Sequence, residues 1–536
     1  MLTPDVLPPI HWTVPVLLLL YYVWDLSVTK VISRRAGKHP LIGSPSWWTP
    51  RVLLNLIFAA KAPWLLEKGY QKFKNGTFQL IRGASPHGAL QHDLLGPYTG
   101  LDLILESRIH HTIVQRKLTP RLPCLTPALE RELVASFDEV FPDCADWTEV
   151  QPFQLLGKVT ARLSARAMVG PNFCRNPVWL DISVKYTESL FKTIVILRVF
   201  PGWMHPVLSR CLPSFWKGQA YLRSAKNLLG PAIHSMILEN DRGAWSPRAT
   251  EEDFNVLAWL VEAAKGQDRN PDTLAHIEVL LALASVHTIL LRQVNVLYDL
   301  IANPEYIDEL QDEIQAVLNQ IGWEDPARSY SMLYKLDSVL RESQHLSPPT
   351  ILGLKRLFKQ SYTFSSGLTI KPGTYVALPV MAIENDPEHT ISPEHFDGLR
   401  SYRLGQANPD TPRKWTEHQF ANMGKTVLNF GYGKSACPGR FFASLVIKMA
   451  FVKLLTEYEC RFLSGAVMSR LPAGAVISAR LRQQLTEWGF EDYKDVLGKV
   501  NQAPYAGWKT FHHSGNLPLP SVDGTCIELI YLALDF

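Results

Sequence analysis

One cysteine of the chain, Cys437, lies in a loop whose neighbours suit it for holding a large flat cofactor. The segment from Phe430 to Ser444 reads FGYGKSACPGRFFAS, with Gly433 before the cysteine and Gly439 after it. Glycine lets backbone approach a cofactor closely. The apolar run after Gly439 predicts a helix whose free N–H groups and positive dipole end favour an anionic sulfur. Phe430 can pack against the cofactor or the sulfur. The alternative is a buried structural cysteine near a helix start, since free cysteines are commonly buried.

A second group of candidate residues lies on a long apolar segment. If residues 273–302 form a helix, Leu, Ile, Val and Ala occupy almost all of its faces, which predicts a central buried helix. Its middle reads ASVHT, from Ala284 to Thr288. Histidine can pass protons near neutral pH, and His287 stands directly before the Thr288 hydroxyl. The alternative is that both are satisfied polar groups of a buried helix.

Composition narrows the class of protein. The 536 residues are 46% apolar and 19% charged, which favours a packed globular body over disorder. A formal net charge of +4 is too small to indicate a nucleic-acid-binding protein. The seven cysteines are scattered and form no C-x-x-C pair, which fits a reducing compartment. No linker interrupts the body, so we expect one large domain.

The N-terminus predicts a membrane anchor. Residues 10–28 are dominated by apolar side chains, and as a helix they would span about 28 Å, enough for the hydrocarbon core. Basic residues follow at once: Lys30, Arg34, Arg35 and Lys38. By the positive-inside rule the body then faces the cytosol. Residues 29–47 form a basic, proline-containing hinge. A cleaved signal peptide and a peripheral hairpin interrupted at Pro15 and Asp25 are the alternatives.

The body is expected to be mainly helical with a small late sheet. Helices are predicted over residues 126–140, 220–238, 273–302, 304–317 and 331–346. A break or kink is expected at Gly230-Pro231. Strands are predicted over residues 361–364, 368–371 and 374–378, separated by turns that contain glycine.

The pattern F-x-x-G-x-x-x-C-x-G, together with the order of the other motifs, resembles the cytochrome P450 family. The phrases KLTPRL, DWTEV and ASVHT look most like fungal microsomal P450s that oxidise terpenoid, meroterpenoid and indole-diterpenoid scaffolds. The resemblance covers residues 48–463 and implies a large helical haem domain with a small β-rich subdomain. It implies haem b (heme b) whose iron is bound by the Cys437 thiolate. Residues 464–536 do not align with the family and form a divergent C-terminal tail of uncertain fold.

The resemblance also implies roles for residues on the central helix. Thr288 takes the position of the alcohol that relays protons to dioxygen, and Ala284 leaves room for the oxygen. His287 stands where the family usually has an acid. The haem propionates would be held by Arg356, Arg116 and Ser435, with His110, Lys117 and Lys434 as alternative partners.

A buried ion network is expected to brace the cysteine loop. Glu342 and Arg400 match the family, but His345 stands where an arginine is usual. Arginine offers a forked, permanently charged set of donors, whereas histidine offers at most two donors and titrates. If His345 were the partner of a buried Glu342, the weaker pair would cost roughly several kcal/mol.

The resemblance, together with the predicted anchor, implies a membrane-anchored haem-thiolate monooxygenase of the endoplasmic reticulum with its catalytic domain in the cytosol. By resemblance it receives electrons from NADPH-cytochrome P450 reductase, with cytochrome b5 as a possible second donor. Its substrate is expected to be a bulky apolar secondary metabolite. One alternative is a degenerate, non-catalytic P450-like protein that binds haem or lipid, and another is an isomerase that needs no external electrons.

Overall fold

The computed structural model describes most of the body of the chain. The described residues are 22–23, 41–42, 51–74, 79–80, 94–142, 144–200, 202–243, 254–323, 325–365, 367–407, 416–463 and 477–481. Residues 22–23 are helical, but the rest of the predicted anchor at 10–28 lies outside the described residues, as do the hinge at 29–47 apart from residues 41–42 and most of the tail.

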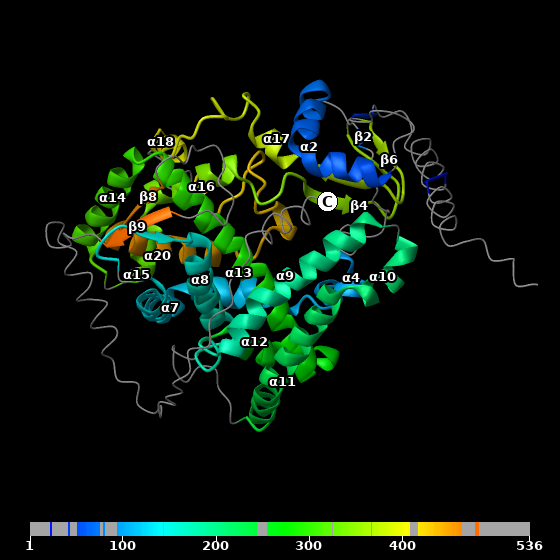
Figure 1. The fold of residues 1–536 in the computed structure, drawn as a ribbon, viewed down its shortest axis with the longest axis horizontal. Coiled ribbons are helices and arrows are strands. Elements are labelled where there is room, and N and C mark those ends of the chain that lie inside the picture. The colour runs from blue at the N-terminus through cyan, green and yellow to red at the C-terminus, as the bar shows by residue number, and fades with distance from the viewer. Residues whose placement is uncertain are drawn as a thin grey trace, which may run out of the picture.

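Helices dominate the described chain, and the strands are short (Figure 1). The longer helices are α2 (Arg51–Lys72), α7 (Thr119–Val140), α8 (Pro152–Met168), α9 (Pro177–Val199), α11 (Pro213–Asp241), α13 (Pro271–Ala302), α14 (Glu305–Ile321), α16 (Tyr334–Leu346) and α20 (Arg440–Glu457). The shorter ones are α4 (Gly96–Thr99), α5 (Leu103–Glu106), α6 (Ile109–Ile113), α10 (His205–Cys211), α12 (Val256–Ala263), α15 (Pro326–Ser331), α17 (Val380–Glu384) and α18 (Arg400–Gln406).

The described residues also include four short turns of other helix types. A π-helical turn, η1 (Val114–Leu118), joins α6 to α7, and 3₁₀ turns occur at η2 (Gly202–Met204), η4 (Gly266–Arg269) and η5 (Gly433–Ser435). Each predicted helix overlaps an observed one: residues 126–140 lie in α7, 220–238 in α11 and 273–302 in α13. Residues 304–317 overlap α14, and residues 331–346 cover the end of α15 and all of α16. The helix α11 runs from Pro213 to Asp241 and is not broken at Gly230-Pro231. The expectation of a mainly helical body with a small β region is confirmed.

The strands form four small sheets among the described residues. They are β1 (Leu41–Ile42), β2 (Gln79–Leu80), β3 (Thr148–Val150), β4 (Gly353–Leu357), β5 (Tyr362–Thr363), β6 (Thr369–Ile370), β7 (Tyr375–Leu378), β8 (Tyr458–Phe462) and β9 (Ile477–Leu481). Strands β1 and β2 pair in parallel, whereas β4 pairs with β7 and β5 with β6 in antiparallel fashion. The three late strands predicted from sequence correspond to β5, β6 and β7.

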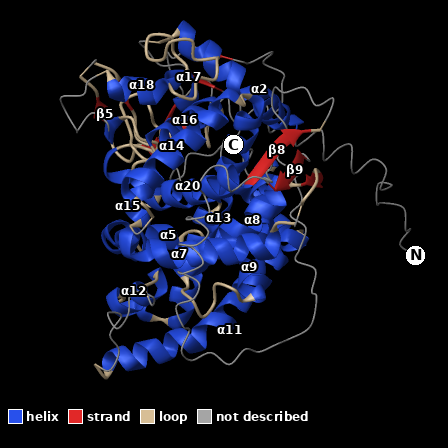
Figure 2. Ribbon diagram, turned by 90° about the vertical axis from the view of Figure 1, so that its left-hand side faces the viewer, coloured by secondary structure: helices blue, strands red, loops and turns tan. Residues whose placement is uncertain are grey.

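The helix α13 forms the centre of the body, where it packs against α8, α9, α11, α16 and α20. Figure 2 shows α13 and α20 at mid-height, with α11 at one end and α17 and α18 at the other. The Asn270 side chain caps the helix by accepting the N–H of Asp272 at 2.8 Å, and Pro271 occupies the first turn. Among the described helices, only α13 is long and apolar enough to cross a membrane, and its apolar stretch is 72% buried. It is therefore the core helix that its apolar pattern predicts.

A three-stranded sheet brings a late segment back to the body. Strand β9 lies between β3 and β8 and runs antiparallel to both. Its Ile477 and Ala479 are buried in the main core. Arg461 of β8 and Arg480 of β9 lie over the Trp147 ring at 3.9 and 4.6 Å from its centre. The folded body thus extends past residue 463, where the sequence pattern places the start of a divergent tail.

The helix α17, which precedes the cysteine loop, is tied to the first long helix. Asp386, two residues after α17, accepts a hydrogen bond from the Tyr70 hydroxyl at 2.7 Å and pairs with Lys74 at 2.5 Å. Lys74 is the main cause that lowers the pKa of Asp386 to about 2. A small apolar cluster of Ala62, Leu65, Leu66 and Leu352 joins α2 to the start of β4. These contacts fix α17 relative to the β region.

Candidate active site

The cysteine loop is a tight turn that leads directly into α20. Its backbone is closed by the Cys437 N–H, which donates to the Phe430 carbonyl at 2.8 Å. Gly431 and Gly433 have φ angles of +78° and +65°, a region that favours glycine. A side chain at Gly433 would meet no atom within 4 Å, so its glycine is needed for the backbone turn itself. Gly439 is the N-cap residue of α20.

Cys437 lies three residues before the first residue of α20. The residue is exposed, but the protein atoms packed around the sulfur raise the pKa of its thiol. The backbone N–H groups of Gly439 and Arg440 and the Arg440 charge act in the opposite direction and favour the thiolate. The Arg440 guanidinium also donates to the Cys437 carbonyl at 2.9 Å. The predicted pairing of a sulfur with the first N–H groups of the following helix is present.

Two residues in the otherwise buried middle of α13, Ala284 and Thr288, are exposed, and we call them the open strip. Between residues 273 and 301, Ala284 and Thr288 are the exposed residues, while Ser285, Val286 and His287 between them are buried. The Thr288 hydroxyl donates to the Ala284 carbonyl at 2.7 Å. The two exposed residues lie one helical turn apart, so they share one face of the helix.

These openings fit a flat cofactor held between α13 and the cysteine loop. The helices α13 and α20 pack against each other, and both are buried over most of their length. An exposed thiol at the start of one, and an exposed alcohol in the middle of the other, are unusual in such a core. Haem bound through Cys437 would cover a thiol of this kind and lie beside such a strip. The residues present therefore fit haem.

His287 lies away from this strip. Its Nε2 is 3.2 Å from the Val184 carbonyl of α9, and its Nδ1 is buried without a hydrogen-bond partner among the described residues. Burial lowers the pKa of His287 to about 4, so the ring is neutral near pH 7 and donates from Nε2. The structure thus places Ala284 and Thr288 together but not His287, whose contact joins α13 to α9.

The proposed propionate partners lie on three separate segments. Arg356 on β4 is exposed, and its guanidinium donates to the neighbouring Lys355 carbonyl at 2.8 Å. Arg116 in η1 and Ser435 in η5 are also exposed. Two of the alternative propionate partners have other surroundings. Lys117 pairs with Glu262 at 3.6 Å, and burial lowers the pKa of His110.

A contact that the sequence did not predict places η1 beside the cysteine loop. The Thr119 hydroxyl, at the end of this π-helical turn, lies 3.4 Å from the Pro438 carbonyl. Short π-helical turns often occur at functional sites. Arg116, three residues earlier, is thereby held near the loop that carries Cys437.

The ion network of Glu342 is complete without His345. Arg400 donates to both carboxylate oxygens of Glu342, at 3.0 and 3.1 Å, and the Asp397 N–H donates at 3.1 Å. Arg400 also donates to the carbonyls of Ile391, Ser392 and His395. Glu342 is therefore well paired. The destabilisation expected from a histidine in place of the usual arginine does not occur at Glu342.

His345 instead pairs with a carboxylate that the sequence did not indicate. Its Nε2 lies 2.8 Å from the Pro393 carbonyl, and its Nδ1 lies 3.8 Å from Glu384 Oε1. Burial lowers the pKa of His345, but the Glu384 carboxylate and the Pro393 carbonyl outweigh burial and the net shift is upward. Nothing in the spacing of Glu384 and His345 along the chain signals this contact, because it depends on how α17 packs against α16.

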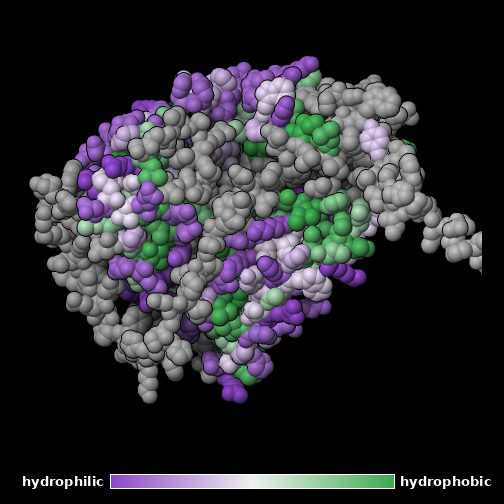
Figure 3. All heavy atoms as spheres, viewed as in Figure 1, coloured by the Kyte–Doolittle hydropathy of each residue, from purple (hydrophilic) through white to green (hydrophobic). Residues whose placement is uncertain are grey.

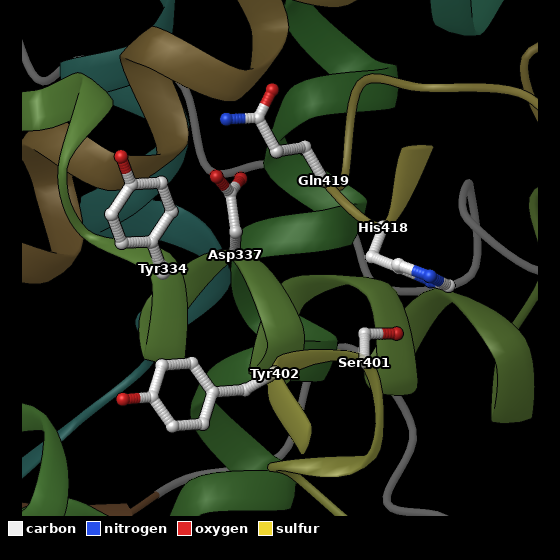
Figure 4. A pocket seen from close by; sticks show the side chains of 6 residues that line it. All are labelled: Tyr334, Asp337, Ser401, Tyr402, His418 and Gln419. Carbon is white, nitrogen blue, oxygen red and sulfur yellow. The ribbon is translucent and has the colours of Figure 1, made fainter. Parts of the chain in front are cut away.

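A small polar pocket lies apart from these residues. Figure 4 shows its lining by Tyr334, Asp337, Ser401, Tyr402, His418 and Gln419. Its free space is about 10 Å³, which is close to the room that one water needs. Asp337 also pairs with the buried Lys448 at 2.7 Å. The pocket is thus part of the packing between α16 and α18 and is too small for an organic substrate.

Comparison with known proteins agrees with this geometry. The sequence model of the family described as "Cytochrome P450" matches residues 125–482, which include β9. A cytochrome P450 monooxygenase of Emericella nidulans is 35% identical over 466 residues, which cover 82% of this chain and 86% of the relative. An ent-kaurene oxidase of Gibberella intermedia is 32% identical over 85% of this chain and 88% of its own length. The monooxygenase paxP of Penicillium paxilli is 32% identical over 79% of this chain and 85% of its own length. The chain therefore belongs to the cytochrome P450 family.

Proposed function

We propose that the chain oxidises a bulky apolar secondary metabolite, of terpenoid or meroterpenoid type, as a haem-thiolate monooxygenase with Cys437 as the iron ligand. One observation carries the proposal: a thiol exposed at the first N–H groups of α20, combined with an exposed alanine–threonine strip in the middle of the buried α13. The fungal relatives, one of which is an ent-kaurene oxidase, support the substrate class.

When bound, haem supplies the activation of dioxygen, which a thiolate ligand favours by donating electron density. Cys437 provides that thiolate, and the N–H groups of Gly439 and Arg440 stabilise its charge. Thr288 Oγ1 moves a proton on the open face of α13, and Ala284 keeps that face free of bulk. Arg356, Arg116 and Ser435, which are all exposed, would hold the propionates. His287 positions α13 against α9 and takes no part in proton transfer in this proposal.

The neighbours of the open strip favour an apolar substrate. Leu283, which precedes Ala284 in the sequence, is half-buried. Leu280 and Val286, two other residues expected to line the site, are buried. An apolar lining with few polar groups suits a bulky hydrocarbon scaffold.

We also propose that the enzyme works at the endoplasmic reticulum membrane, anchored by residues 10–28, with electrons from NADPH-cytochrome P450 reductase and cytochrome b5. The apolar N-terminal sequence and its flanking bases support the anchor. Figure 3 shows hydrophobic side chains gathered on the surface over α2 and α10. The exposed large apolar residues of α2, η2 and α10 include Trp64, Trp203 and Val207, at 57%, 67% and 68% exposure. Such a surface suits contact with lipid.

The test of the function is a reduced carbon monoxide difference spectrum of microsomes that contain the full chain. A red-shifted Soret band, typical of a thiolate ligand, is expected because Cys437 and its helix start are arranged for it. Terpenoid substrates are then screened with and without NADPH. Absence of the band, or only the blue-shifted inactive form, would favour the degenerate alternative. Turnover without NADPH would favour an isomerase.

Replacement of Thr288 by alanine is expected to separate NADPH consumption from product formation. The variant removes the hydroxyl that donates to the Ala284 carbonyl and leaves a smaller side chain, which cannot block the open face. Loss of a positioned proton donor typically lowers the rate by about 100- to 10,000-fold. The measurement is the ratio of product to NADPH oxidised. Ser285→Ala, at the buried neighbouring hydroxyl, is the control, and full coupling in Thr288→Ala would contradict the relay.

A further inference from the structure

We propose that Glu384 is a positioning residue for the Cys437 loop, which it braces from one side through Asn429 while its charge is balanced by His345 on the other. This inference rests on the haem-thiolate function proposed above, and it assigns a role to residues that the sequence analysis did not single out. Glu384 is the last residue of α17 and is 4% exposed.

The two carboxylate oxygens of Glu384 bind different partners. Oε1 lies 3.8 Å from His345 Nδ1 on α16, and Oε2 accepts the Asn429 side-chain N–H at 2.7 Å. The Glu384 carbonyl accepts the Thr390 hydroxyl at 2.8 Å, which holds the end of α17 in place. A single buried carboxylate thus joins α16 to the segment that enters the cysteine loop.

The connection from Glu384 to the cysteine is short. Asn429 directly precedes Phe430, whose carbonyl accepts the Cys437 N–H at 2.8 Å. The Phe430 ring is also packed edge-on against Phe420, with centroids 5.3 Å apart. A shift of Asn429 would therefore move the carbonyl that closes the loop. This is why the Glu384–Asn429 bond acts on the position of Cys437 without touching the cofactor.

Charge balance explains why His345 is suited to this place. Glu342 has Arg400 as its cation, so His345 is left to serve Glu384. Arg341 also interacts with Glu384 electrostatically, but its guanidinium donates to the carbonyls of Glu417 and Gln419. A buried carboxylate that loses its cation is strongly destabilising. His345, held near Glu384 by the Pro393 carbonyl, supplies a cation that can titrate.

The titration of His345 determines how the stability of this contact changes with pH. The charged groups that act on His345 are Glu384 and Glu342, and with the Pro393 carbonyl they raise its pKa above the usual value. The stabilisation by protonated His345 is fully present below the unfolded pKa of about 6.5 and is lost as the pH rises through the raised folded value. The bracing of the loop should therefore weaken at alkaline pH.

The experiment follows the thiolate Soret band of the haem-loaded full chain during incubation between about pH 6 and about pH 9, where histidine titrates. The wild-type band is expected to decay faster as the pH rises. His345→Arg, a permanent cation, should remove this alkaline acceleration. Glu384→Gln should make decay at pH 6 roughly tenfold faster, as for loss of a charged hydrogen bond, and nearly independent of pH.

A double variant separates positioning from mere disruption. His345→Gln removes the cation that is paired with the buried Glu384, so adding Glu384→Gln to it is expected to slow the decay of the band relative to His345→Gln alone. The matched control is Glu394→Gln, because Glu394 and His395 form a similar pair at 3.3 Å on the surface, both well exposed. Its pH profile should equal that of the wild type. Thermal unfolding of each variant, followed by far-UV circular dichroism over the same pH range, gives a readout independent of turnover.

The possible outcomes separate this inference from the proposed function. The inference is supported if Glu384→Gln and His345→Arg each abolish the alkaline acceleration and the double variant recovers stability. It is overturned if Glu384→Gln keeps the wild-type pH profile, or if His345→Arg still decays faster at high pH. If the wild type itself shows no thiolate band, the proposed function fails, and a wild-type band with unchanged variants refutes only the role of Glu384.

Discussion

Cys437→Ser is expected to abolish the thiolate Soret band and to reduce substrate oxidation to the background rate. Serine keeps the size of the side chain and the N–H bond to the Phe430 carbonyl, so the loop should fold. Its hydroxyl cannot supply the soft anionic sulfur that the start of α20 is arranged to stabilise. The measurement is the reduced carbon monoxide spectrum, with haem content determined separately.

The chain offers a matched control for this variant. Cys211 on α10 is the other exposed cysteine among the described residues. Cys211→Ser makes the same substitution at another exposed cysteine, and it should leave the band and the turnover as in the wild type. Retention of the band or of turnover by Cys437→Ser would refute Cys437 as the iron ligand.

Removal of the residues after Leu463 is expected to destabilise the body strongly, whereas a chain that ends at Leu481 should keep every contact described for the sheet. The shorter chain loses β9, the middle strand between β3 and β8. Burial of one large aliphatic side chain such as Ile477 is worth about 1.5–3 kcal/mol. The cation–π contact of Arg480 with Trp147 adds about 0.5–1 kcal/mol. The expected loss is therefore about 2–4 kcal/mol before the ladder hydrogen bonds are counted.

The comparison is made by urea unfolding of the two truncated chains and the full chain, with haem absorbance as the readout. Ile477→Ala in the full chain isolates the core contribution and should cost about 2–5 kcal/mol. Val178→Ala, at an exposed position of α9, is a control that should change the free energy of unfolding little. If the chain that ends at Leu463 is as stable as the full chain, β9 is dispensable.

The features that could be predicted from sequence are those whose partners lie close together along the chain. The glycine turn, Cys437 and the start of α20 lie within residues 431–440, and helix geometry alone brings the first N–H groups to the sulfur. The apolar pattern of α13 likewise predicts a buried core helix, and the spacing of Ala284 and Thr288 puts both on one face. Local geometry and side-chain period were sufficient for these features.

Tertiary structure decided the features that depend on how separate elements pack. His287 is adjacent to Thr288 in sequence, yet the approach of α9 captures its ring through the Val184 carbonyl. His345 keeps the expected i, i+3 spacing from Glu342, but the position of α17 gives it Glu384 as a partner instead. Strand β9 has no local pattern strong enough to mark it, because its place is set by pairing with β3 and β8. Helix spacing determines which residues share a face, whereas packing between elements determines which partner that face meets.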